Sequence, residues 1–271
     1  MIASKISVAI LIVASTTPTG SYMSKITFDG QYQTFGEVTS ANPLPPDYHS
    51  ENLVDSITVL AKTRLACREQ GMLPKPNWGN GRENIVSAVL SMLNKPLSVL
   101  DIGGGVGTMY FSLKASCDIE LDYTVMELPT TCEMGRKLLP EVKFVSGVPA
   151  EHFDAVTFCS ALQYFEDYKS IIAEALQGLP DTVILTDTPT GPADTFSCAQ
   201  LNIAGRAIPI WVFNQTEIIE LFEAQGYRLR MKALSHFPFH NFDNYEGNAS
   251  KTYFTNFVFV ENDPGSWLLV R

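Results

Sequence analysis

The stretch SVLDIGGGVGTMYF, residues 98–111, joins a short apolar run to a cluster of glycines. Asp101 stands two residues before the first glycine, and glycines recur at positions 103, 105 and 107. A buried strand that ends in a glycine-rich turn and leads into a helix is typical of α/β proteins that bind nucleotide-like ligands. The residues around this stretch must therefore show whether strands and helices alternate, and which ligand the turn suits.

Apolar runs and helical patterns alternate along the chain from residue 98 onward. The expected strands are Ser98–Ile102, Tyr123–Leu128, Val142–Ser146, Ala155–Ser160 and Thr182–Asp187. These runs are apolar on both faces, which predicts a mostly parallel sheet with helices on both sides. Two further runs, Arg228–Ser235 and Lys251–Val260, have no helix between them, so we expect them to pair antiparallel at one edge. The prediction is an α/β fold with a seven-stranded, mostly parallel sheet.

Capping signals mark several of the helices between these strands. Asn214 followed by Glu217 predicts a helix that begins at Asn214 and ends at Gly226. The pattern Thr130-x-x-Glu133 predicts a capping box at the start of another helix. The other expected helices are Asp167–Gly178, Leu53–Gln70 and Arg82–Asn94.

The domain organisation is predicted from shifts in composition. Residues 1–23 form a tail or a possible targeting segment, residues 24–96 an aromatic arm and a helical cap, residues 97–262 the main domain and residues 263–271 a second tail. Lys5 and the apolar run at 8–14 resemble a signal peptide, but a dispensable tail, or an upstream start codon ahead of a true start at Met23, is the favoured interpretation. The apolar run is too short to span a membrane.

Charge and cysteine usage narrow the class of partner. The chain of 271 residues has a formal net charge of −10 and no basic patch, which weighs against nucleic acid as a partner. Its five cysteines are widely spaced, are odd in number and include no CxxC pair, so we expect a reduced, cytoplasmic protein without a metal site. We expect no membrane partner, and the sequence leaves the oligomeric state open.

The spacing of the glycines discriminates between cofactors. A dinucleotide turn needs G-x-G-x-x-G, and Thr108 stands where its third glycine belongs. A phosphate-binding loop needs a Lys-Ser or Lys-Thr pair, and none follows this turn. An acidic residue followed by G-x-G-x-G instead favours S-adenosyl-L-methionine, with Asp101 accepting from its ammonium group. The expected contacts in the turn are Asp101, Gly103, Gly104, Gly105 and Gly107.

The ends of two later strands supply the other expected contacts with this cofactor. Glu127 ends the next strand, where a carboxylate can accept from both hydroxyls of a ribose. Leu128 beside it offers an apolar surface for the adenine. The run SALQY follows the fourth strand, and we expect Ser160, Ala161 and Gln163 to line the methionine half of the cofactor.

Several longer fragments together resemble a family of largely uncharacterised class I methyltransferases. They are FDGQYQTF, VLDIGGGVGTMYF, YTVMELPTTCEMGRKL, CSALQYFED, TDTPTG and IPIWVFNQTEIIELFEAQGY, and the resemblance covers roughly residues 28–260. It implies a Rossmann-like domain that uses S-adenosyl-L-methionine. Two features depart from general class I patterns: no carboxylate follows the third strand, and the His-Asp base motif of plant O-methyltransferases is missing.

The expected reaction is methyl transfer to a small-molecule or glycan-type acceptor, at oxygen. A hydroxyl acceptor needs a base, and the candidates near strand ends are Asp187, His236 and Tyr164. The segment 188–213, with Trp211 and Phe213, has the length of a lid over the acceptor. The alternative function is a catalytically silent S-adenosylmethionine-binding regulatory protein, which needs no base. The sequence leaves the acceptor molecule open.

Overall fold

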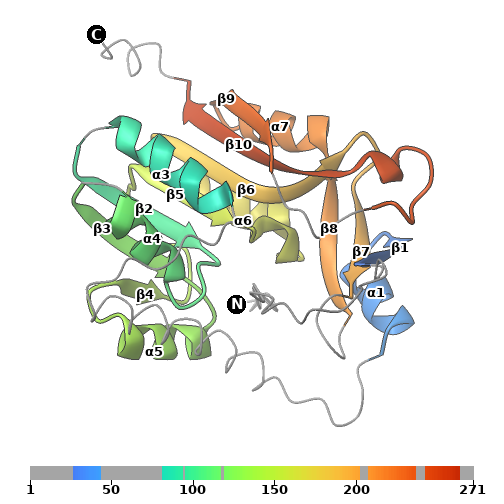
Figure 1. Cartoon of the computed structure of the whole chain (residues 1–271), viewed down its shortest axis with the longest axis horizontal. Coiled ribbons are helices and arrows are strands. Elements are labelled where there is room, and N and C mark those ends of the chain that lie inside the picture. Colours follow the sequence, from blue (N-terminus) through green and yellow to red (C-terminus); the bar gives the residue numbers. More distant parts are fainter. Residues whose placement is uncertain are drawn as a thin grey trace, which may run out of the picture.

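A twisted sheet forms the centre of the protein (Figure 1). Seven of its ten strands make up the main sheet. The computed structural model describes residues 27–43, 81–93, 95–116, 119–201, 207–235 and 242–262. The strands are β2 (Leu97–Ile102), β3 (Leu121–Met126), β4 (Lys143–Val145), β5 (Ala155–Cys159), β6 (Thr182–Gly191), β9 (Tyr227–Leu234) and β10 (Tyr253–Glu261). Their order is β4-β3-β2-β5-β6-β10-β9, and β10 is the one strand of these seven that runs in the opposite direction to the others. The sheet predicted from the sequence is confirmed, including the antiparallel pair at the edge.

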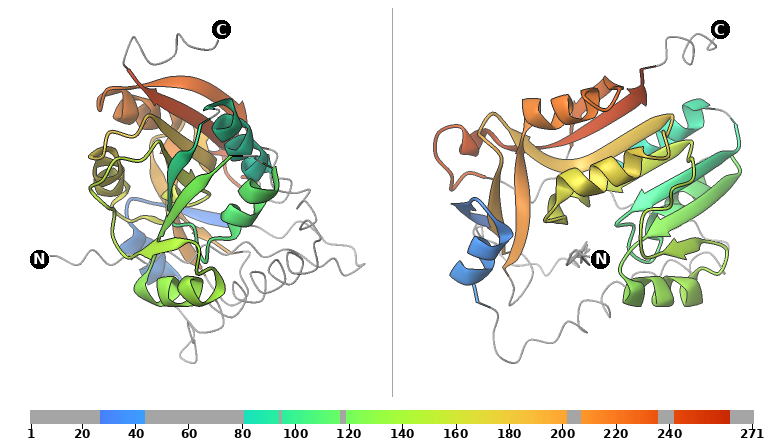
Figure 2. Two further views of the ribbon diagram at one scale, coloured as in Figure 1. Left: turned by 90° about the vertical axis from the view of Figure 1, so that its left-hand side faces the viewer. Right: turned by 180° about the vertical axis from the view of Figure 1, so that it is seen from behind.

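Helices cover both faces of this sheet. One face carries α3 (Gly81–Leu93), α4 (Thr108–Ser116) and α5 (Pro129–Leu138), and the other carries α6 (Tyr168–Leu176) and α7 (Gln215–Glu223). The left view of Figure 2 shows the helices on the two sides of the sheet. Along β6, Ile184 packs in the core under α3, α4 and α5, whereas Val183 and Leu185 pack in the core under α6 and α7. Burying both faces explains why the strands are continuously apolar.

The helix starts agree with the sequence in two cases and differ in one. The side chain of Asn214 accepts from the backbone N–H groups of Thr216 and Glu217, and Asp167 caps α6 in the same way. The capping box expected at Thr130 is wrong, because α5 begins one residue earlier. Pro129 occupies its first turn, and Leu128 is the N-cap without a side-chain hydrogen bond.

Three further strands continue the ten-stranded sheet from the end of β6 and are called the second sheet below. It contains β1 (Phe28–Tyr32), β7 (Phe196–Gln200) and β8 (Ile208–Asn214), and α1 (Phe35–Ala41) packs beside it. The last two residues of β6, Thr190 and Gly191, pair with Phe213 and Asn214 of β8. The described part of the aromatic arm forms β1 and α1, and the described part of segment 188–213 forms the end of β6, all of β7 and most of β8. Each becomes a strand only by pairing with a distant part of the chain.

Aromatic packing joins the second sheet to the main core. Phe28 of β1 is buried and stacks on Phe242 with ring centroids 4.6 Å apart. Phe213 is also buried and packs against Tyr168 of α6. Trp211 is half-buried, and its Nε1 donates to the backbone oxygens of residues 165 and 166. Phe213 is therefore a core residue, and the indole of Trp211 is fixed in place.

Some expectations fall on residues that the structure leaves undescribed. The expected helix at 53–70 lies outside the described residues, and so does most of the predicted helical cap. The helix expected at 82–94 is confirmed as α3. None of the helices in the described part of the chain is both long and apolar enough to cross a membrane.

Candidate functional site

The glycine turn lies at the carboxyl-terminal edge of the main sheet, between β2 and α4. The N–H of Gly103 donates to the carbonyl of Met126 on β3 over 2.9 Å, which ties the turn to the neighbouring strand. Within the turn, the N–H of Gly107 donates to the carbonyl of Gly104 over 3.1 Å. Open α/β sheets bind ligands at this edge, so the turn lies where a cofactor is expected.

Asp101 lies beneath the glycine turn and is fully buried. The hydroxyl of Tyr123 donates to one of its carboxylate oxygens over 2.8 Å, and the hydroxyl of Thr157 donates to the other over 3.0 Å. A Cβ on Gly104 would collide with this carboxylate. Asp101 therefore supports the turn from inside the sheet, and its predicted contact with the ammonium group of the cofactor, directly or through water, remains a prediction.

Gly105 and Gly107 have different neighbours although both have positive φ angles. At Gly105, with φ +61°, a Cβ would meet no atom of the described structure within 4 Å. At Gly107, with φ +82°, a Cβ would lie 3.0 Å from the side chain of Leu139. Both backbone conformations favour glycine. Gly105 borders open space in front of the turn, whereas Gly107 is required by packing.

Glu127 follows β3 and is 5% exposed. Its Oε2 accepts from the backbone N–H of Leu128 over 2.7 Å, and the carboxylate also accepts from the backbone of Gly105. Burial raises the pKa of this carboxyl to about 7, although these two hydrogen bonds act in the opposite direction. Leu128 is half-buried beside it. A carboxylate this deeply buried beside an open glycine turn is suited to accept hydrogen bonds from a ligand.

A second polar group lies where β5 ends and beside it on β6, at the same edge of the sheet. Ser160 and Asp187 both have left-handed backbones, with φ angles of 56° and 49°. The N–H of Ser160 donates to the carbonyl of Thr186 over 2.9 Å. The side-chain amide of Gln163 donates to Ser160 Oγ over 3.3 Å and to the carbonyl of Asp187 over 3.4 Å. Such backbone conformations are uncommon outside glycine and cluster at functional sites.

The side-chain carboxyl and the backbone N–H of Asp187 both have hydrogen-bond partners on the two strands that follow β6 in the sheet, β10 and β9. The hydroxyl of Ser235, directly after β9, donates to Asp187 Oδ1. The N–H of Asp187 donates to the side-chain oxygen of Asn256 on β10 over 2.9 Å. Asp187 is 1% exposed. The sequence contained no signal for Ser235 or Asn256, because they lie 48 and 69 residues away from Asp187 in the chain.

The remaining predicted site residues differ in where they lie. The hydroxyl of Tyr164 donates to Gln200 Oε1 on β7 over 2.8 Å, and both side chains are buried. Ala161 is fully buried. His236 lies outside the described residues. Tyr164 thus joins the end of β5 to the second sheet.

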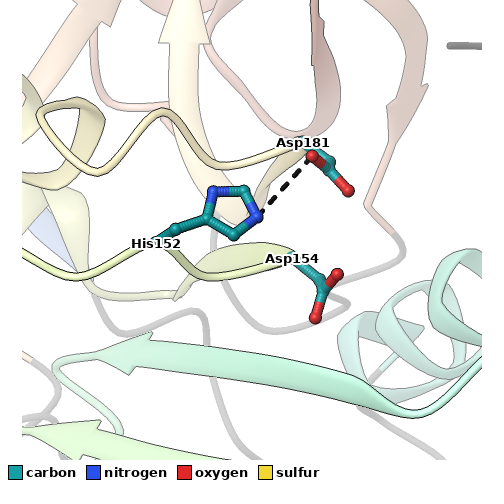
Figure 3. Close-up of side chains that lie close together, drawn as sticks. All are labelled: His152, Asp154 and Asp181. Carbon is teal, nitrogen blue, oxygen red and sulfur yellow. Dashed lines mark ion pairs between the residues drawn. The ribbon is translucent and has the colours of Figure 1, made fainter.

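The opposite edge of the sheet carries a different charged group, shown in Figure 3. His152, Asp154 and Asp181 place ligand-type atoms within 4.8 Å of one another. Lys95 Nζ lies 2.6 Å from Asp154 and 3.3 Å from Asp181, and His152 Nε2 lies 3.8 Å from Asp181. The lysine ammonium occupies the centre of this acidic group, which is therefore an ion-pair cluster at the amino-terminal edge.

Comparison with known proteins identifies the family. The sequence profile of a family described as a methyltransferase domain matches residues 78–232, more than half of the chain. The chain belongs to this methyltransferase family. It is an S-adenosylmethionine-dependent methyltransferase with a Rossmann-like fold, as its sequence predicted.

Solved structures show a general likeness to the methyltransferase. The 1,6-didemethyltoxoflavin-N1-methyltransferase of Burkholderia thailandensis is 17% identical, with a TM-score of 0.46 over 82% of this chain and 94% of that one. The magnesium protoporphyrin IX methyltransferase of Synechocystis PCC 6803 is 15% identical, with a TM-score of 0.45 over 67% of this chain and 80% of that one. No curated protein sequence matches significantly. The family assignment rests on the profile match.

The residues at the carboxyl-terminal edge of the methyltransferase fit its cofactor. The open space in front of Gly105 leaves room for a ligand against the backbone. Glu127 provides carboxylate oxygens at the end of β3, and the half-buried Leu128 provides an apolar surface beside them. Among the described residues, the buried Gln163 Oε1 has no hydrogen-bond partner and has capacity for a ligand donor.

Proposed function

We propose that this methyltransferase transfers a methyl group to an oxygen of a small-molecule or glycan-type acceptor. The observation that carries the proposal is the position of two buried carboxyl groups: Glu127 directly follows β3, and Asp187 lies within β6 at the level where the neighbouring β5 ends. The glycine turn lies between them in strand order. One carboxyl group would hold the cofactor, and the other would serve the acceptor.

On the cofactor side, Glu127 accepts hydrogen bonds from the ribose hydroxyls and Leu128 contacts the adenine. Gly103 and Gly105 let the backbone approach the methionine half, and Ser160 and Gln163 line its other side. Asp101, Gly104 and Gly107 act by holding the turn in shape, which the contacts of Asp101 with Tyr123 and Thr157 support. Ala161 contributes through packing, because it is fully buried.

On the acceptor side, Asp187 receives the proton of the reacting hydroxyl. When bound, S-adenosylmethionine supplies an electrophilic methyl group on a sulfonium, so the protein has to align the acceptor, exclude water and remove one proton. Asp187 suits the last task because it lies at the ligand-binding edge on a strained backbone. Tyr164 is a positioning residue, since its hydroxyl is held by Gln200. His236 remains a candidate second base.

The proposed partners and location follow from the charge and the cofactor. A net charge of −10 favours a small neutral or cationic acceptor over a nucleic acid. We propose a cytoplasmic location, where the methyl donor is available to the enzyme.

Calorimetry tests the cofactor site. We expect S-adenosylhomocysteine and S-adenosylmethionine to bind with one site per chain and NAD not to bind. Glu127→Ala should weaken S-adenosylhomocysteine at least tenfold, because it removes charged hydrogen bonds to the ribose. Equal affinity of the variant and the wild type would refute the role given to Glu127.

An acceptor screen tests the reaction. A panel of phenols, catechols, hydroxy acids, sugars and primary amines is incubated with S-adenosylmethionine labelled in its methyl group, and transfer of the label is counted. We expect label on hydroxyl compounds, and Asp187→Asn should lower kcat by about 100-fold, the usual range for loss of a general base. Labelling of the amines alone would contradict oxygen as the acceptor atom, and full activity of Asp187→Asn would remove Asp187 from catalysis.

A further inference from the structure

The pairing of β6 with β10 contains one irregularity, and it lies at Asp187. Thr188 pairs with Thr255 and Leu185 pairs with Phe257, so Thr186 and Asp187 together oppose the single residue Asn256. Two residues opposite one is a β-bulge on β6. Bulges redirect side chains and are frequent next to active sites.

The bulge changes the side of the sheet toward which Asp187 points. In a regular strand, Asp187 would share a face with Val183 and Leu185, because side chains alternate with a period of two. That face is the apolar core under α6 and α7. With φ at +49°, Asp187 instead places its carboxyl beside Ser235, at the end of β9. The extra residue therefore keeps a carboxyl group out of the apolar core.

Asn256 closes the bulge from the opposing strand. Its side-chain oxygen accepts from the N–H of Asp187 over 2.9 Å, and its side chain is 1% exposed. A backbone N–H at this depth would lose a strong interaction if the amide were removed. An apolar side chain at 256 would favour a return to regular pairing, in which the Asp187 carboxyl points elsewhere.

We propose that Asn256 is a positioning residue that holds the bulge and aims the Asp187 carboxyl at the acceptor. This inference rests on the proposed role of Asp187 as the proton acceptor. Asn256 lies on β10, whereas Glu127 and the glycine turn follow β3 and β2. The bulge also bonds to Ser160 and Gln163, the proposed contacts with the methionine half, through the carbonyls of Thr186 and Asp187. The loss of Asn256 should therefore lower kcat much more than it weakens cofactor binding.

The test compares two substitutions on β10 in the full-length enzyme. Asn256→Ala removes the acceptor for the Asp187 amide. Thr255→Val, the matched control, removes an equally buried hydrogen bond of 2.9 Å between Thr190 and Thr255, on the same two strands but outside the bulge. The acceptor is the hydroxyl compound from the screen with the highest turnover, and kcat is expressed per S-adenosylhomocysteine-binding site so that unfolded molecules do not count.

We expect kcat of Asn256→Ala to fall 10- to 100-fold, as misplacement of a reacting group by about 1 Å does. Its KM for S-adenosylmethionine and its affinity for S-adenosylhomocysteine should change less than fivefold, because Glu127 and the glycine turn do not belong to the bulge. Thr255→Val should keep kcat within threefold. Equal kcat losses in the two variants, or an equal loss of cofactor affinity in Asn256→Ala, would overturn the proposal.

Amide hydrogen exchange tests the geometry without an acceptor. Protection of the Asp187 amide should fall at least tenfold in Asn256→Ala and remain unchanged in Thr255→Val. Retained protection in Asn256→Ala would overturn the proposal even if kcat fell. If Asp187→Asn kept full activity, the base assignment would fail, whereas the exchange measurement would still report whether Asn256 holds the bulge.

Discussion

Carboxyl groups at the two edges of the main sheet have pKa values shifted in opposite directions. At the amino-terminal edge, Asp154 accepts hydrogen bonds from Lys95 and from both the N–H and the hydroxyl of Ser98. Burial acts to raise the pKa of Asp154, but the hydrogen bonds from Lys95 and Ser98 outweigh it and lower the pKa overall. At the carboxyl-terminal edge, Glu127 forms no salt bridge within the described part of the chain, and burial raises its pKa to about 7.

The two carboxyl groups therefore contribute to the stability of the folded state with opposite signs. A carboxylate paired with a lysine favours the folded state at neutral pH, whereas a carboxyl group buried without a cation opposes it. Asp154 can therefore be understood from the folded chain alone. Under the proposed function, the cost of burying Glu127 is offset by hydrogen bonds to the cofactor, and the following predictions test that contrast.

The largest expected effect is on cofactor affinity at Glu127. Glu127→Gln keeps the shape of the side chain but replaces charged hydrogen bonds to the ribose, each worth about 1.5–3 kcal/mol. We expect the Kd of S-adenosylhomocysteine to rise about 100-fold by calorimetry at pH 8. Asp154→Asn, at the other edge, is the control and should change Kd less than twofold. A change below threefold in Glu127→Gln would contradict the role of its charge.

The next effect separates two glycines of one turn. Gly107→Ala should destabilise the enzyme by about 2 kcal/mol, because the new Cβ lies 3.0 Å from Leu139 and the backbone φ is positive. The folded molecules should bind S-adenosylhomocysteine normally. Gly105→Ala should cost only about 1 kcal/mol of stability but weaken binding about 20-fold, because its Cβ enters the ligand space. Urea denaturation measures stability and calorimetry measures the affinity for S-adenosylhomocysteine. If one variant were the more impaired in both measurements, the division of roles between Gly105 and Gly107 would be wrong.

The sequence predicted the main sheet because its strands are apolar on both faces, a pattern that hardly depends on distant contacts. It also singled out Glu127 and Asp187 as candidate site residues by their positions at the ends of such strands. It failed where structure depends on pairing across the chain. Phe28–Tyr32 becomes β1 only through β7, and β6 continues past its expected end at Asp187 because β8 and β10 pair with it.

The same limit explains what the sequence missed around the predicted site residues. It placed Asp101 before the glycine turn but could not show that Tyr123 and Thr157 bond to it from neighbouring strands. Asn256 carried no motif, because its importance arises from one extra residue in the opposing strand.

The third effect is on the stability of the ligand-free enzyme and has the opposite sign to the effect on affinity. Because the pKa of Glu127 is about 7 when folded and 4.5 when unfolded, its contribution to stability falls as the pH rises from 4.5 to 7 and stays low above 7. Glu127→Gln should therefore raise the free energy of unfolding by about 2 kcal/mol at pH 8, after allowance for one lost hydrogen bond. At pH 5 most of this gain should vanish. Urea denaturation at both pH values measures it, and destabilisation at pH 8 would show that the carboxylate is not strained.

The smallest effect is expected at the amino-terminal edge. Lys95→Ala should cost only about 0.5–1 kcal/mol, because the side chains of Lys95 and Asp181 are 48% and 44% exposed and solvent screens their attraction. The hydrogen bonds from Ser98 to Asp154 remain in this variant. Since the pKa of Asp154 is lowered in the folded state, its stabilisation is present above its unfolded pKa and is lost as the pH falls through its folded pKa. The loss in Lys95→Ala should shrink in 0.5 M salt, with unchanged affinity for S-adenosylhomocysteine. A change in that affinity would show that the two edges are coupled, and the contrast between a stabilising edge and a binding edge would then be wrong.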